Sequence, residues 1–305
     1  MHWQTSRYLV DLASPKVMGI VNVTPDSFSD AGAYAEPHAA QALCDRLVKD
    51  GADILDIGGE STRPGAVPLT AEEELARVLP VIRHAVTLGV PVSVDTYKPQ
   101  VMQACLDLGA DIINDVWALR WRDPHMGVTG RDMIARHKTC GVCLMHMHRE
   151  PATMQAAPMV GDAMPLVLLF LKHVTQDLRE LGVEMSRVCI DPGIGFGKTV
   201  AQNFSLLARQ NELVALGYPL LAGWSRKSSL AAVTQRSLSA VATLDPVERM
   251  VPSIAAALLA VQHGAHVVRV HDVKETVQAL RVLAAMRQQG LQVKEVHKSN
   301  AGSSQ

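Results

Sequence analysis

The chain has 305 residues, of which 48% are hydrophobic, 19% charged and only 4% aromatic, and its formal net charge is -1. This length is sufficient for one large α/β domain with an aliphatic core, although two domains would also fit. A charge this close to zero gives no basic surface of the kind that binds nucleic acid, so any anion must be held by local groups. The N-terminus has no signal-peptide pattern, no apolar run is long enough to span a membrane, and five scattered cysteines fit a reducing compartment. We therefore expect a cytoplasmic protein that has no nucleic-acid or membrane partner.

Eight short apolar runs recur along the chain, and nearly all of them end on a polar residue. In chain order they read VMGIVNV, ADILDIGG, PVSVD, IINDV, GVCLMHMH, VCID, LLAGWSRK and VVRVH. Continuous runs of Val, Ile and Leu are typical of buried parallel strands. Segments with helical periodicity lie between them, at 38–49, 71–88, 99–108, 164–181, 203–216, 247–262 and 273–288. The alternation predicts an α/β protein that forms a single (β/α)8 TIM barrel, with an open doubly wound sheet as the alternative.

Local signals mark the ends of several predicted helices. Thr70 and Glu73 form a capping-box pattern, and Pro99 stands at a first helical turn, where its missing N–H is tolerated. The polar segment Trp117–Arg131 is expected to be an extended loop. Residues 1–15 are assigned to an N-terminal extension, residues 16–290 to the barrel and residues 291–305 to a disordered tail. Six glycines follow predicted helices, in positions that favour a left-handed backbone: Gly51, Gly89, Gly109, Gly182, Gly217 and Gly264.

Cys140 and Cys143 form a C-x-x-C pattern. A second pair at zinc-finger spacing is missing from the sequence, and an isolated pair supplies too few ligands for a structural zinc site. The pattern also straddles the start of a predicted strand and does not open a helix, as a redox motif would. Buried structural thiols are the favoured interpretation.

The polar residues at the strand ends indicate one functional face, because active sites of such barrels lie at the carboxyl ends of the strands. A carboxylate with a neighbouring amide can bind the edge of a flat ring such as a 2-amino-4-oxo-pyrimidine. The acids could instead be structural partners of basic residues, but Arg226 and Lys227 are too few to neutralise them all. An apolar floor for such a ring could come from Met145 and Phe196. The acids and the amide in question are Asp56, Asp95, Asp191 and Asn114.

A second group of strand ends is suited to anions. The eighth and first strands of a closed barrel are neighbours, so Arg269 and His271 are expected beside Asn22, with Thr62 and Arg63 next to them. Two guanidinium groups, an imidazole, a hydroxyl and an amide make a plausible cradle for a diphosphate. The side-chain oxygen of Asn22 can also bind a Mg²⁺ whose other ligands are phosphate oxygens and water. The segment SRKS, from Ser225, opens a predicted helix whose N-terminus favours the carboxylate or phosphate of a second substrate.

Several of these segments together resemble one known family. MGIVNVTPDSFSDAG, DIGGESTRPGA, VSVDTYKP, IINDV, MHM, DPGIGFGK, SRKS and RVHDV are similar, in this order, to the signature segments of the dihydropteroate synthases. The resemblance extends from about Met18 to the final helix. It implies a TIM barrel that joins 4-aminobenzoate to 6-hydroxymethyl-7,8-dihydropterin diphosphate in folate biosynthesis, releases diphosphate, uses Mg²⁺ and is a target of sulfonamides.

The resemblance also implies a role for each matching residue. Asn22 would bind the Mg²⁺, and Asp30 would help to order the first loop over the site. The pterin would be bound by Asp95, Asn114, Asp191 and Lys227, with support from Asp56, Met145, Gly195 and Phe196. The diphosphate would be held by Asn22, Thr62, Arg63, Arg269 and His271, and 4-aminobenzoate would lie near Phe28, Thr62, Pro64 and Ser225. The residues implied to act in catalysis are Asn22, Arg63, Lys227, Arg269 and His271.

Two segments depart from the family pattern. His148 and Arg149 stand where relatives commonly have Gln-Gly, and the loop Leu119–Arg131 is longer than usual. Both lie toward the fourth and fifth strands, so they affect fine substrate contacts more than the reaction. The alternatives are the methyltetrahydrofolate-binding barrel of a corrinoid methyltransferase and a non-catalytic pterin-binding protein. Resemblance further implies a homodimer formed through the last helices.

Overall fold

The computed structural model describes residues 1–24, 36–61, 66–123, 127–151, 153–234, 245 and 247–302. Its main sheet has eight parallel strands, hydrogen-bonded in the order β8-β7-β6-β5-β4-β3-β10-β9. A parallel bridge between Ile190 and Leu220 joins the two outer strands, and the amide of Ile190 donates to the carbonyl of Pro219 at 2.9 Å. The strands are β3 (Lys16–Asn22), β4 (Ile54–Gly58), β5 (Val92–Asp95), β6 (Ile112–Asp115), β7 (Gly141–Met145), β8 (Val188–Asp191), β9 (Leu221–Ala222) and β10 (Val267–Val270). The eight predicted strands are therefore confirmed, and the sheet closes as a barrel.

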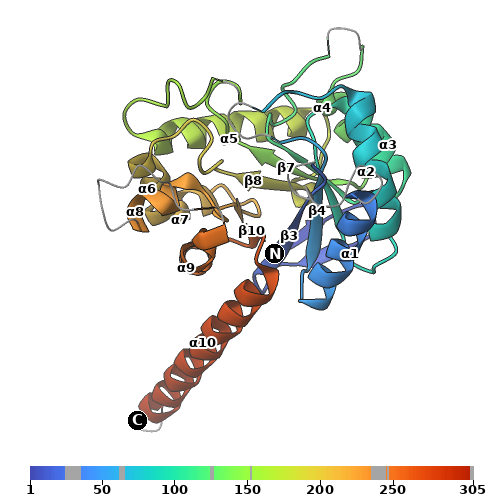
Figure 1. Cartoon of the computed structure of the whole chain (residues 1–305). Helices are drawn as coiled ribbons and strands as arrows, with labels where there is room; N and C mark the ends of the chain where they lie inside the picture. Colours follow the sequence, from blue (N-terminus) through green and yellow to red (C-terminus); the bar gives the residue numbers. More distant parts are fainter. Residues whose placement is uncertain are drawn as a thin grey trace.

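Helices surround the barrel, as Figure 1 shows. They are α1 (Glu36–Lys49), α2 (Ala71–Ala85), α3 (Pro99–Asp107), α4 (Gly130–Arg136), α5 (Ala163–Glu180), α6 (Val200–Ala208), α7 (Gln210–Val214), α8 (Ser228–Thr234), α9 (Met250–Gln262) and α10 (Val273–Gly302). Two short 3₁₀ turns, η2 (Met185–Arg187) and η3 (Val247–Arg249), precede β8 and α9. The buried core between strands and helices is mainly Val, Ile, Leu and Ala, as expected for a chain with few aromatic residues.

The local end signals are confirmed. The Thr70 hydroxyl accepts from the Glu73 amide, and the Glu73 carboxylate accepts from the Thr70 amide, which completes the capping box of α2. Pro99 is the first residue of α3. The six glycines that follow predicted helices all have positive φ, from 78° at Gly89 to 101° at Gly51. These positions obey short-range rules, so the sequence is sufficient to predict them.

Two element predictions were wrong. The single helix expected over 203–216 is split into α6 and α7, because Arg209 leaves helical geometry at ψ 16° and serves as the cap of both. The loop expected over Trp117–Arg131 contains the start of α4, where Thr129 and Asp132 form a capping box with a shorter acid than the usual Glu or Gln. A helix of only 7 residues carries too little periodicity to be recognised from its pattern.

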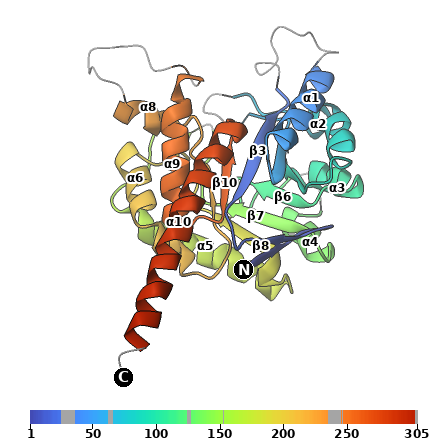
Figure 2. The same cartoon turned by 90° about the horizontal axis from the view of Figure 1, so that it is seen from below.

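The C-terminal helix is longer than the composition suggests. The backbone of α10 continues to Gly302, through most of the segment for which we expected a disordered tail, and it projects away from the barrel (Figures 1 and 2). Residues 291–300 contain no proline and several good helix formers, which permits the helix to continue. Low apolar content removes packing partners but does not by itself stop a helix.

A two-stranded antiparallel hairpin, β1 (His2–Gln4) and β2 (Leu9–Asp11), precedes the barrel. Its Trp3 side chain is fully buried and donates from Nε1 to the carbonyl of Arg187 at 3.0 Å. The hairpin thereby closes the amino-terminal end of the barrel and leaves the opposite end for the site. Trp3 packs in one apolar cluster with Leu12 and the inward side chains Met18, Ile54, Ile112, Cys143, Cys189, Leu221 and Val267.

Candidate active site

The acidic residues predicted at the carboxyl ends of the strands meet inside the barrel. We call this open end of the barrel the mouth. The guanidinium of Arg269, from β10, donates to Asp56 Oδ2 at 2.5 Å and to Asp95 Oδ2 at 2.7 Å. The side-chain amide of Asn114 donates to the same Asp56 oxygen at 3.1 Å. The other oxygen, Asp56 Oδ1, is buried and has no hydrogen-bond partner among the described residues. Three strands therefore place two carboxylates and an amide around one cation, with acceptor capacity left over.

Burial dominates the electrostatics of this cluster. It raises the pKa of Asp95 to about 7, although the charge of Arg269 acts in the opposite direction. Burial likewise raises the pKa of Asp191, against the Gly193 amide and the charge of Lys227. Burial acts to lower the pKa of the Arg269 guanidinium, but the charges of Asp56 and Asp95 outweigh it, and the pKa is raised overall. These carboxyl groups keep their negative charge only where N–H donors or cations compensate for lost water.

A glycine-rich turn follows β8 and forms one wall of the mouth. Asp191 accepts the amide hydrogen of Gly193 at 2.7 Å, and the backbone of Gly193, Gly195 and Gly197 has positive φ. The ammonium of Lys227 lies 4.3 Å from the centre of the Phe196 ring, a cation–π contact. Phe196 packs against an apolar cluster that contains Met145. The floor predicted from Met145 and Phe196 therefore forms one surface, next to Lys227.

The ends of β9 and β10 meet on the other side of the mouth. Ser225 Oγ and His271 Nδ1 are 2.9 Å apart, and the His271 amide donates to Ser225 Oγ at 3.1 Å. Arg226 has a left-handed backbone, at φ 59°, and its guanidinium pairs with Asp272 at 2.7 Å. Ser225 and His271 are thus brought together. Arg269, which we expected beside Asn22 with His271, donates to the carboxylates of Asp56 and Asp95 in this structure. The attraction of two buried carboxylates accounts for this choice.

The rest of the predicted anion site is only partly described. Asn22 is the last residue of β3 and is half-buried, in register with Gly58 of β4. Thr62, Arg63 and Pro64, and also Phe28 and Asp30, lie outside the described residues.

Two buried lysines near the mouth were missed by the sequence reasoning. Lys98 bonds Glu60 and, at 2.5 Å, Glu74, and Glu60 also accepts from Tyr97 at 2.8 Å and from the Leu69 amide at 3.0 Å. Lys198 donates to three backbone carbonyls, and burial lowers its pKa to about 7. Their position in the sequence could have identified both lysines as candidate site residues, since each follows the end of a strand by a few residues.

The described residues include no group of three or more His, Cys, Asp or Glu side chains that could hold a metal. Mg²⁺ prefers oxygen ligands and commonly keeps phosphate oxygens and water in its coordination sphere. The amide oxygen of Asn22 fits the part of a single protein ligand to such an ion. The five cysteines are buried free thiols, so Cys140 and Cys143 have the structural role favoured above.

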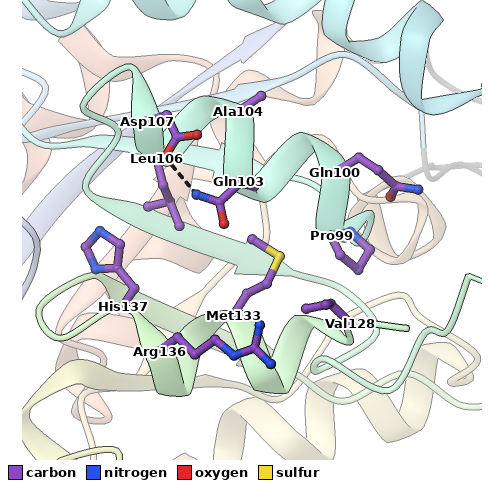
Figure 3. Close-up of a pocket in the computed structure, with 10 residues that line it drawn as sticks. All are labelled: Pro99, Gln100, Gln103, Ala104, Leu106, Asp107, Val128, Met133, Arg136 and His137. Carbon is purple, nitrogen blue, oxygen red and sulfur yellow. Dashed lines mark hydrogen bonds between the residues drawn. The ribbon is translucent and has the colours of Figure 1, made fainter. Parts of the chain in front are cut away.

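A separate cavity of about 510 Å³ lies on the outer helix layer, between α3 and α4 (Figure 3). Its walls include Gln103, Met133, Arg136 and His137, and a hydrogen bond joins Gln103 to Asp107 at 2.7 Å. Its lining residues do not include Asp56, Asp95, Asn114 or Arg269, so this cavity is distinct from the candidate active site. Among the described residues, no helix is long and apolar enough to cross a membrane.

Comparison with known proteins agrees with this geometry. The family described as pterin binding enzyme matches residues 18–271. Dihydropteroate synthase from Neisseria meningitidis serogroup B is 45% identical over 289 residues, which cover 93% of this chain and 97% of the relative. Solved structures of the Xanthomonas albilineans dihydropteroate synthase are also similar. The structure with 4-aminobenzoic acid has 47% identity and a TM-score of 0.82 over 92% of this chain and 95% of that one. The structure with 7,8-dihydropteroate has 44% identity and a TM-score of 0.81 over 94% and 99%. The chain therefore belongs to the pterin binding enzyme family, within the group of the dihydropteroate synthases.

Proposed function

We propose that this protein joins 4-aminobenzoate to 6-hydroxymethyl-7,8-dihydropterin diphosphate, giving 7,8-dihydropteroate and diphosphate. The cluster of Asp56, Asp95 and Asn114 is the observation that best supports this assignment. It offers buried carboxylate oxygens, one of them without a partner among the described residues, to the N–H edge of a flat heterocycle. Arg269 donates to one oxygen of each carboxylate, Asp56 Oδ2 and Asp95 Oδ2, which leaves Asp56 Oδ1 as an acceptor for the ring edge.

The opposite side of the pterin would be read by Asp191 and Lys227, over the floor made by Met145 and Phe196. The ring carbonyl is an acceptor, which suits the ammonium of Lys227, and the ring N–H groups suit Asp191. The carboxylate of 4-aminobenzoate would lie toward the N-terminus of α8, which begins at Ser228, next to Ser225. Phe28, Thr62 and Pro64 would complete that part of the site.

Bond exchange would occur at the exocyclic methylene carbon of the pterin. Its bond to the diphosphate oxygen breaks, the aryl amine nitrogen bonds to the carbon, and the amine loses a proton. His271, Arg63 and Arg269 would stabilise the charge of the departing diphosphate. Ser225 positions His271 by their 2.9 Å contact. A Mg²⁺ held by Asn22 and the diphosphate would supply further charge neutralisation.

We also propose a homodimer formed through the last helices and a cytoplasmic location. Exposed apolar side chains on α9 and α10, among them Val251 at 71% and Val282 at 72%, support the first part. Five buried free thiols support a reducing compartment. Sulfonamides, as analogues of 4-aminobenzoate, are expected to compete at its subsite.

The test is a coupled assay of diphosphate release with dihydropteroate detected by chromatography. Release is expected only when 4-aminobenzoate and Mg²⁺ are both present, and one product of each kind should form per turnover. Pterin binding without turnover would contradict the synthase assignment and favour a non-catalytic pterin-binding protein. Methyl transfer from methyltetrahydrofolate to a corrinoid would favour the methyltransferase alternative, which has no use for a diphosphate site.

A further inference from the structure

Lys198 is a buried cation with an unusual set of partners. Its residue is only 3% exposed, and its ammonium donates to Gly193 O at 2.8 Å, Phe196 O at 3.2 Å and His146 O at 3.3 Å. An ammonium has three N–H donors and no acceptor, so three carbonyl oxygens match its capacity. All three acceptors are backbone carbonyls, so Lys198 fixes the backbone conformation and not the position of another side chain.

The three carbonyls belong to the glycine turn and to the neighbouring strand end. Gly193 and Phe196 lie within the turn that follows β8, and His146 is the residue directly after β7. These oxygens converge on the Lys198 ammonium, which donates to all three. The turn also packs tightly against the strand end, since a Cβ built on Gly193 would stand only 1.9 Å from the His146 oxygen. Carbonyl dipoles that point at one buried spot repel one another unless a cation lies between them. Lys198 therefore stabilises a turn geometry that would otherwise be unfavourable.

This turn carries groups that face the proposed pterin pocket. Asp191 accepts from the Gly193 amide at 2.7 Å, and Gly195 lies against Lys227, whose Cδ would be 3.2 Å from an added Cβ. The Phe196 ring is 4.3 Å from the Lys227 ammonium. A shift of the turn would displace Phe196 and change the contacts that the turn makes with Lys227 and Asp191. Ser225 and His271 bond each other outside the turn and would keep their contact.

We propose that Lys198 is a positioning residue for pterin recognition, which sets the glycine turn through its three carbonyl bonds and so places Asp191, Phe196 and Lys227. Lys198 does not touch the substrate in this arrangement. The inference rests on the proposed function and adds to it a residue whose loss should affect one substrate and spare the other.

The test compares Lys198→Met with Arg187→Met. Arg187 is a matched control, because it is another buried cation, 4% exposed, that donates to backbone carbonyls, Cys140 O at 2.9 Å and Ile134 O at 2.8 Å. It precedes β8 at the amino end of the barrel, away from the mouth. Both variants should lower the melting temperature. Only Lys198→Met should weaken the apparent binding of the pterin diphosphate, with a roughly tenfold higher KM, while the KM for the other substrate, the aminobenzoate, should change by less than about twofold.

Direct binding and a conservative variant provide further readouts. The Kd of the fluorescent compound 6-hydroxymethylpterin should rise in Lys198→Met by about the same factor as KM, and Lys198→Arg should recover part of the affinity, because it retains a cation with several donors. If Lys198→Met gives no folded protein, Lys198→Gln, which keeps two N–H donors without the charge, takes its place and the same comparison decides.

A pterin KM and Kd within twofold of wild type, together with a lower melting temperature, would overturn the inference and leave Lys198 as a stabilising residue only. Equal losses of pterin affinity in the Lys198 and Arg187 variants would overturn it too. Failure of the proposed function looks different, since the wild-type protein itself would then form no dihydropteroate.

Discussion

At the scale of single residues, the site contains a charge cluster in which one cation faces two carboxylates. Arg269 serves two carboxylates, Asp56 and Asp95, and one Asp56 oxygen lacks a partner among the described residues. A buried ion pair of this kind is weak support for stability, because desolvation offsets most of the attraction between the charges. Its value lies in the acceptors that it keeps ready for the N–H groups of a ligand.

We predict that pterin affinity depends on pH through Asp95. Burial raises the pKa of Asp95 to about 7, and only the ionised carboxylate can accept hydrogen bonds from the ring edge without a proton of its own. Affinity for 6-hydroxymethylpterin should therefore decrease as the pH is lowered, by roughly tenfold for each pH unit well below that pKa. Fluorescence titration between about pH 5 and pH 8, a range that spans this pKa, measures the effect. The slope should flatten in Asp95→Asn, and a pH-independent wild-type affinity would contradict the assignment.

The same carboxyl group contributes to stability with the opposite dependence. The folded protein holds this proton more tightly than the unfolded chain, whose reference pKa is 3.8. Asp95 thus contributes stability that is fully present below about pH 4 and is lost as the pH rises through about 7. Binding improves over the pH range in which this contribution is lost, a compromise often found at functional sites.

At the scale of elements, the turn after β8 shows how a local backbone requirement shapes the mouth. Gly193 has φ 67°, and no Cβ fits there because His146 O would lie 1.9 Å away. Gly182 also has positive φ, at 84°, but a Cβ there would meet no atom within 4 Å. The pair separates the effect of backbone conformation from the effect of close packing.

We predict that Gly193→Ala lowers the free energy of unfolding by more than about 3 kcal/mol, because the clash adds to the left-handed backbone strain. Gly182→Ala, which meets only the strain, should lower it by about 1 kcal/mol. Urea unfolding followed by circular dichroism gives both values. Equal effects of the two substitutions would show that the turn yields to the added methyl group, and the tight approach to His146 would not then be required.

At the scale of the whole molecule, the barrel is closed at one end and open to chemistry at the other. The hairpin β1–β2 presses Trp3 into the amino-terminal end, against inward side chains of several strands. The carboxyl end carries the charged cluster, Ser225 with His271, and the glycine turn. This division is the one expected for TIM barrels, where the lower end serves stability and the upper end serves function.

We predict that Trp3→Ala lowers the free energy of unfolding by about 3–5 kcal/mol through the cavity that it leaves. The KM values for both substrates should remain within about twofold, because Trp3 lies at the end opposite to the mouth. Leu9→Ala is the control, since Leu9 lies in the same hairpin with 60% of its surface exposed, and it should change stability by less than about 0.5 kcal/mol. A large rise in either KM for Trp3→Ala would mean that the amino-terminal end of the barrel and the mouth are coupled.

The sequence by itself determined the barrel, the strands and their polar ends, because these depend on short-range periodicity and on strand-terminating residues. The capping box at Thr70 and the left-handed glycines followed from equally local rules. The sequence also predicted that one face would carry several polar side chains, since parallel strands end together. These are Asp56, Asp95, Asn114 and Asp191. Side-chain partners were beyond its reach.

Only the tertiary structure decided that Arg269 donates to Asp56 and Asp95, that Lys198 donates to three carbonyls, and that Trp3 closes the amino-terminal end of the barrel. Each of these contacts depends on elements brought together by the fold, and Arg269 and Asp56 are 213 positions apart. The orientation of such a side chain depends on the balance of desolvation and charge in a closed space. That balance exists only after all eight strands have met.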